Sequence, residues 1–245
     1  HRGHTRARRA RAGLDGSLTV GPRLHIRVDH LLIAAPDLEG GRDYAESIFG
    51  TRPVIGGVHP GQGTRNALLG LEDDTYIEII APDPAQPADL PLSQYLASRS
   101  SPALSWWCAR CEELEALQDA IRDAGLDAGS IDPWSRKRPD GEDLSWRLLM
   151  PNVPEFGASL PFFISWDDMA LHPSRHVPAA GRLEKLVVSQ QGADVLEELL
   201  GVAAEIRADA APALSAEIAL TDAALTLRTP ETFPPAIGEI IRRGT

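Results

Sequence analysis

The chain has 245 residues, a formal net charge of −11 and 43% hydrophobic residues. This length can bury one large core or two smaller ones. The acidic balance argues against a nucleic-acid partner, which needs a basic face, and no run approaches the roughly 18 apolar residues that a membrane-spanning helix needs. Because only two cysteines occur and no export signal is recognisable, we expect a cytoplasmic protein without a disulfide scaffold.

The first 24 residues differ in composition from the rest. They open with "HRGHTRARRARAG", which is strongly basic and has no apolar core. We expect residues 1–24 to be a disordered arm, or a segment foreign to the natural chain, and we leave them out of the fold prediction.

Three later segments share one pattern: an apolar strand, a turn residue, an amphipathic helix and a final glycine. In the first, Asp37 is a suitable N-cap. The three helices are predicted to end at Gly50, Gly125 and Gly201, about 75 residues apart. Three extended segments follow each helix, so each unit reads β-α-β-β-β. The pattern predicts an α+β fold with a cupped, mixed or antiparallel sheet, made from paired modules over residues 25–100 and 101–175 and a shorter third module over 181–245.

Two polar residues interrupt apolar strands of the first unit. His30 opens the first strand, and Glu78 lies in the middle of the last, in "TYIEIIAP". A carboxylate in an apolar strand is costly unless it is paired, protonated or bound to a cation. If the two strands are neighbours, both side chains can face one cleft, where imidazole and carboxylate suit a divalent metal. The alternatives are a hydrogen-bonded buried histidine and an outward-facing glutamate.

Several separated motifs together resemble the vicinal oxygen chelate superfamily. They are "DHLLIAAPDLEGG", "GVHPGQGTRNALLGL" and "YIEIIAPDP", and the similarity to its glyoxalase-like members extends over about Val28 to Pro173. The resemblance implies a glyoxalase/bleomycin-resistance-like fold, in which first- and last-strand residues of both modules hold a divalent metal (Zn, Fe, Mn, Co or Ni). His30 and Glu78 match the two ligand positions of the first module, and are the catalytic candidates.

The second unit departs from this pattern. Aligning the repeats places Ser105 and Phe163 at the second pair of ligand positions, and phenylalanine cannot bind a metal. In the third unit the corresponding residues are Glu184 or Lys185 and Thr226, which do not complete the set. Either other side chains, among them His59, His172 and His176, complete the shell, or the cleft binds its ligand without metal.

Further residues are candidates for contacts with a substrate. "VHPGQGTRN" is a Gly-rich bend that either approaches a ligand or merely connects two strands. "HPSRHVP" is a lid or, on the strength of its prolines, a linker. The predicted substrate-binding residues are His59, Thr64, Asn66, Trp107, Arg147 and His172.

A competing motif lies in "WWCARCEEL", where Cys108 and Cys111 precede a helix as in thiol redox proteins. The repeat pattern already accounts for this strand–helix junction, so redox function is the weakest hypothesis.

The leading hypothesis is a metal-dependent enzyme, a lyase, isomerase or dioxygenase, that acts on a small polar substrate with neighbouring oxygens by stabilising an enolate or oxyanion. The alternative is a metal-free protein that binds or sequesters a small molecule in the same cleft. A homodimer is a further expectation.

Overall fold

The computed structural model describes residues 24–137, 141–201 and 203–242. Nearly all of the expected basic arm, residues 1–24, therefore lies outside the described residues. The described strands form two sheets, one of eight strands and one of four. Within the described chain, no helix is both long and apolar enough to cross a membrane.

The eight-stranded sheet consists of two similar halves joined edge to edge. Its order is β2-β3-β4-β1-β5-β8-β7-β6. The strands of the first half are β1 (Arg27–Ala34), β2 (Val54–His59), β3 (Thr64–Leu71) and β4 (Thr75–Pro82). Those of the second are β5 (Ala103–Arg110), β6 (Ile131–Lys137), β7 (Asp143–Leu149) and β8 (Phe162–Trp166).

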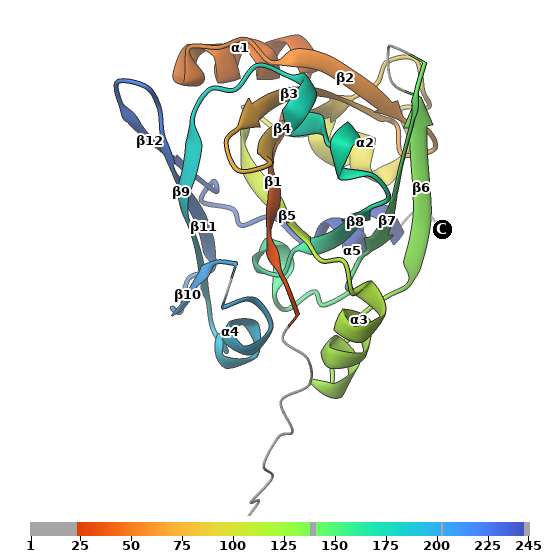
Figure 1. The fold of residues 1–245 in the computed structure, drawn as a ribbon, viewed down its shortest axis with the longest axis vertical. Helices are drawn as coiled ribbons and strands as arrows, with labels where there is room; N and C mark the ends of the chain where they lie inside the picture. The colour runs from red at the N-terminus through yellow and green to blue at the C-terminus, as the bar shows by residue number, and fades with distance from the viewer. Residues whose placement is uncertain (1–23, 138–140, 202, 243–245) are drawn as a thin grey trace, which may run out of the picture.

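The pairing of these strands gives each half the expected neighbours. The first strand of each half lies parallel to the last, β1 beside β4 and β5 beside β8, and β1 and β5 pair antiparallel at the junction. The end strands β2 and β6 contact each other, so the sheet curls into a nearly closed barrel (Figure 1). This confirms the predicted cupped sheet of paired β-α-β-β-β units.

Helix α1 (Leu38–Phe49) shows why the sequence folds as predicted at this point. The Asp37 side chain accepts a hydrogen bond from the Gly40 N–H at 2.7 Å, and Gly50 ends the helix at φ 69°. Glycine adopts this left-handed conformation without the clash that a Cβ causes. The helix packs against β4.

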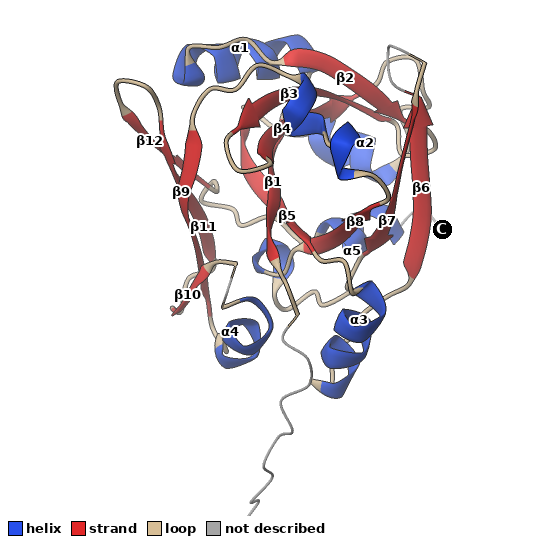
Figure 2. Ribbon diagram, viewed as in Figure 1, coloured by secondary structure: helices blue, strands red, loops and turns tan. Residues whose placement is uncertain are grey.

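The remaining helices are short. They are α2 (Pro91–Ala97), α3 (Leu114–Asp123), α4 (Asp194–Leu200) and α5 (Ile237–Arg242), with 3₁₀ turns η1 (Gly157–Ser159), η2 (Met169–Leu171) and η3 (Pro173–His176). Helix α3 buries Leu114, Leu117 and Ile121, the face that the sequence predicts. Figure 2 shows α1, α3 and α4 at the periphery of the strands, whereas α2 and α5, which contact each other, overlap the ring of strands in this view.

The third unit forms the four-stranded sheet, in the order β10-β9-β11-β12. Its strands are β9 (Arg182–Gln190), β10 (Glu205–Ala208), β11 (Ala213–Ala219) and β12 (Ala224–Arg228). The elements follow the predicted β-α-β-β-β order, but the first strand lies beside the second and third rather than beside the last. The third unit is therefore not a copy of the first two, and it stands to one side of the barrel (Figure 1).

We predict that Gly41→Ala destabilises the protein although alanine favours helix. A Cβ at Gly41 would lie 2.6 Å from Ile79 Cγ2 and 2.8 Å from Ala35 Cβ, so the helix must shift away from the sheet. Overpacking of this kind costs about 1–3 kcal/mol, and the better helix propensity recovers only about 1 kcal/mol. Urea unfolding measures the difference; the exposed Ser47→Ala on the same helix serves as control, and equal stability of the two variants would contradict the prediction.

Candidate functional site

The concave face of the barrel encloses a cavity between the two halves of the sheet. Its volume open to water is about 100 Å³, well above the roughly 10–15 Å³ that a single buried water needs. Most of the polar lining comes from the first half. The polar lining residues are His30, His59, Gln62, Thr64, Asn66, Tyr76, Glu78 and Arg136.

Glu78 is the centre of the polar wall. One carboxylate oxygen, Oε2, lies 3.4 Å from His30 Nε2. The other, Oε1, accepts a hydrogen bond from Asn66 Nδ2 at 2.8 Å and lies 3.6 Å from His59 Nε2. The strand pairing brings these groups together. Strands β1, β4 and β3 are successive neighbours in the sheet, and every second residue of a strand points to the same face. The first half thus gathers two imidazoles and an amide around one buried carboxylate.

The β2–β3 hairpin holds His59 in this position. Its turn contains Gly61 and Gly63, both at positive φ. A side chain at Gly63 would also meet Ser93 and Leu90. His59 Nδ1 is 2.8 Å from Thr64 Oγ1. The Gly-rich segment is therefore a strand connection that also delivers a histidine to the cavity.

Asn66 links the β2–β3 hairpin to Glu78. Its Oδ1 accepts the Gly57 N–H at 2.7 Å, while its Nδ2 donates to Glu78. Burial lowers the pKa of His59, and the attraction of Glu78 opposes that shift only in part. His59 is therefore a neutral imidazole at neutral pH.

Asp29, a residue that the sequence analysis did not single out, lies behind His30. Its Oδ1 is 2.8 Å from His30 Nδ1, and its Oδ2 accepts Trp166 Nε1–H at 3.0 Å and is 3.2 Å from His172 Nε2. The strand has a register shift between Val28 and His30, so two consecutive side chains can contact each other. The signal in the sequence was the one used for Glu78, a carboxylate inside an apolar strand.

Asp29 is fully buried and stays ionised. Burial alone would raise its pKa, but hydrogen bonds and charge interactions with His172 and His30 outweigh it and hold the pKa well below the usual range. The carboxylate fixes the His30 ring so that Nδ1 faces Asp29 and Nε2 faces Glu78. In metal sites, a carboxylate behind a ligating histidine has this orienting role.

The strand register corrects the alignment of the second half by one residue. His30 lies opposite Cys108 and Leu32 opposite Trp106, so the approximate two-fold axis relates His30 to Trp106. Glu78 pairs with Leu32, and Phe162 pairs with Cys108; Glu78 therefore corresponds to Phe162. The predicted equivalents Ser105 and Phe163 are wrong, because a shift of one residue reverses the face of a strand.

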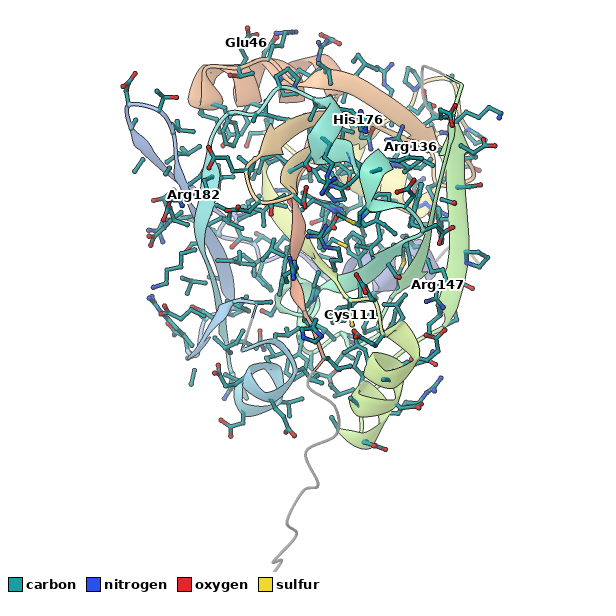
Figure 3. The ribbon with its side chains drawn as sticks, viewed as in Figure 1. Glu46, Cys111, Arg136, Arg147, His176 and Arg182 are labelled. Atoms are coloured by element: carbon teal, nitrogen blue, oxygen red, sulfur yellow. The ribbon has the colours of Figure 1, made fainter. Side chains whose placement is uncertain are left out.

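Only some of the predicted substrate-contact residues line the cavity. His59, Thr64 and Asn66 line the cavity. Trp107 does not belong to the lining; it is fully buried and donates from Nε1 to the Ser159 carbonyl. Arg147 pairs with Glu115 of α3, outside the cavity (Figure 3).

The two histidines of "HPSRHVP" lie in different environments. His172 is buried behind the cavity on Asp29, whereas His176 is exposed on η3 and contacts the Ala170 carbonyl. The segment contains the 3₁₀ turn η3 and follows directly after η2. Neither histidine belongs to the lining of the cavity.

His30 and Glu78 have the separation that two ligands of one divalent metal need. The 3.4 Å separation of His30 Nε2 and Glu78 Oε2 is the spacing of two tetrahedral ligands with bonds of about 2.1 Å. Behind it, Asp29, His30 and Cys108 place one possible ligand atom each within 4.8 Å of one another. Asp29 already accepts three hydrogen bonds there, whereas His30 and Glu78 both line the cavity.

We predict that both cysteines are unreactive in the folded protein. Both are buried, and burial raises the pKa of Cys111 to about 11 and that of Cys108 also well above its usual value. Thiol titration at about pH 8 should be at least a hundredfold slower, in rough terms, than in denaturant, since the thiolate is the reactive form. Fast reaction of Cys108 in the native protein would instead favour the redox hypothesis.

We predict that Asp29→Asn weakens folding in a pH-dependent way. Removing the charge from a buried hydrogen-bonded group costs roughly 3 kcal/mol. Because the folded-state pKa is lowered, wild type has this stability above about pH 4 and loses it as the pH falls. The deficit of the variant should therefore be full at about pH 7 and shrink towards pH 3. Urea unfolding at both pH values measures it, with the exposed Asp119→Asn as control; a constant deficit would contradict the prediction.

Comparison with known proteins agrees with this architecture. A family model described as a glyoxalase-like domain matches residues 28–204, and no curated protein matches the chain. Among solved structures, a hypothetical protein from Staphylococcus aureus aligns at 15% identity over 83% of this chain and 85% of its own, with a TM-score of 0.57. This similarity concerns the fold alone.

Methylmalonyl-CoA epimerases are also found, with lower scores. A variant from Streptomyces coelicolor, in complex with 2-nitronate-propionyl-CoA, has 20% identity over 58% of this chain and 98% of its own, with a TM-score of 0.45. The epimerase from Mycobacterium tuberculosis has 19% identity over 57% and 86%, with a TM-score of 0.38. The family match and the paired β-α-β-β-β halves together identify the chain as a glyoxalase-like member of the vicinal oxygen chelate superfamily.

Proposed function

We propose that this protein is a metal-dependent enzyme acting on a small molecule that carries two neighbouring oxygens. The observation that supports it best is the pair of His30 Nε2 and Glu78 Oε2, 3.4 Å apart in the wall of the cavity. The reaction belongs to the lyase, isomerase or dioxygenase type. We further expect a homodimer and a cytoplasmic location.

His30 and Glu78 would hold the metal. A bound divalent ion would polarise the neighbouring substrate oxygens and stabilise an enolate or oxyanion. Asp29 holds the His30 ring, and Asn66 holds Glu78 Oε1, which leaves Oε2 directed at His30. Both donors are therefore fixed before any ligand arrives, which reduces the ordering cost of binding.

His59 is the candidate for proton transfer. It is a neutral imidazole whose Nε2 faces the cavity near Glu78 Oε1. A neutral imidazole can accept a proton from the substrate and return it. The Thr64 hydroxyl, 2.8 Å from Nδ1, fixes the ring during both steps.

The metal-free alternative draws its support from the second half of the barrel. Trp106 and Phe162 occupy the positions equivalent to His30 and Glu78, so the four-residue ligand set of the family is half replaced by aromatic residues. A protein that only binds or sequesters its ligand needs no metal there.

Metal analysis of the purified protein distinguishes these two proposals. After incubation with Fe, Mn, Zn, Co or Ni and removal of excess metal, we expect about one equivalent to be retained by wild type. His30→Ala and Glu78→Ala should each retain less than about a tenth of an equivalent, since a single remaining ligand binds weakly. The exposed His25→Ala and Glu46→Ala serve as controls. Wild type that retains less than about a tenth of an equivalent of every metal would sink the enzyme proposal and favour the binding protein.

A further inference from the structure

The apolar wall of the cavity contains a row of three tryptophans. Trp134 on β6 pairs with Trp146 on β7, and Trp146 pairs with Trp166 on β8. Cross-strand partners project from the same face of a sheet, and all three line the cavity. The rings of Trp146 and Trp166 have centroids 5.4 Å apart and an interplanar angle of 50°. Three of the five tryptophans of the chain are thus concentrated on one wall.

Trp166, at one end of the tryptophan row, lies beside the polar residues around His30. Trp166 donates its indole N–H to Asp29, the carboxylate that holds His30. Phe162, on the same strand and face as Trp166, meets the His30 ring edge-on at 5.6 Å. A molecule with its oxygens at His30 and Glu78 therefore has its remaining atoms against the indoles.

The lining of the cavity favours a particular character of that molecule. The space open to water, about 100 Å³, accommodates one ring with a short polar substituent. Leu148, Met150 and Ile241 complete the wall around the indoles. Away from Arg136, which also lines the cavity, polar groups on this part of a ligand would lose their water without gaining a partner. Flat rings, by contrast, gain stacking and edge-to-face contacts with indoles beyond the burial of area.

We propose that the ligand of this site is a compact aromatic molecule, a single ring that carries two neighbouring oxygens on a short substituent. This inference rests on the proposed function for the oxygen-binding end, but the tryptophan row alone determines the ring. It predicts that ring recognition and metal recognition are separable.

Calorimetric titration with matched probes tests the ring preference. Benzoylformate has a phenyl ring and two adjacent oxygens, cyclohexylglyoxylate has the same polar end on a non-planar ring, and pyruvate lacks the ring. We expect benzoylformate to bind at least about tenfold more tightly than pyruvate and roughly threefold more tightly than cyclohexylglyoxylate. Equal affinity for benzoylformate and pyruvate would overturn the proposal, as would the absence of binding of benzoylformate at millimolar concentration.

Variants assign the preference to the tryptophan row. Trp146→Leu should weaken benzoylformate binding roughly three- to tenfold and leave pyruvate binding unchanged. Trp134→Leu, at a half-buried position, gives a second test should Trp146→Leu fail to fold. Phe49→Leu removes a buried aromatic ring at the end of α1 that does not line the cavity. It is the matched control. A loss of ring preference in the control alone, or in neither tryptophan variant, would overturn the assignment.

Glu78→Gln separates this proposal from the proposed function. If the enzyme proposal holds, the variant weakens benzoylformate and pyruvate by the same factor and keeps the ratio between them. If wild type binds no metal but still prefers the aromatic probe, the proposed function fails and the ring proposal stands. If metal binds as expected but the ratio is near one, the ring proposal fails alone.

Discussion

The buried Asp29 carboxylate is the interaction on which the site depends. A charge inside the protein is tolerable only when hydrogen bonds and opposite dipoles replace the lost water. Asp29 has hydrogen-bond partners on three segments: His30 on β1, Trp166 on β8, and His172 in the connection to the third unit. The Arg110 guanidinium of β5 lies 3.8 Å from it. The need to satisfy one carboxylate thus fixes the two halves of the barrel, the connecting 3₁₀ turns and the imidazole of the site with respect to one another.

The fold is nearly two-fold symmetric, but the cavity it builds is not. The first half supplies Glu78 and its histidine and amide neighbours, and the second supplies Phe162 and the indole wall. This division has a physical advantage, because apolar residues that exclude water lower the local dielectric and strengthen the charge interactions of the polar half. The loss of two family ligand positions is therefore compatible with a more selective cavity.

Buried charge and repeat spacing predicted the fold and the His30–Glu78 pair, because both signals are local in the chain. The register between the halves was not predictable, since the shift next to Asp29 changes which residues of β1 and β5 oppose each other. Alignment of the repeats by sequence therefore places Ser105, rather than Trp106, at the position equivalent to His30. Alternation along one strand could not place Trp107 or Arg147 with respect to the cavity. The tryptophan row depends on the pairing of three strands, which no single segment encodes.

Part of the cavity lining comes from the C-terminal segment, which lies outside the family match. The family match ends at residue 204, whereas Ile237 and Ile241 of α5 line the cavity and the Pro235 carbonyl accepts the Trp106 indole N–H. The third sheet thus carries the end of the chain back into the barrel. The family domain supplies the polar residues of the cavity, and the sequence after it supplies part of the apolar lining.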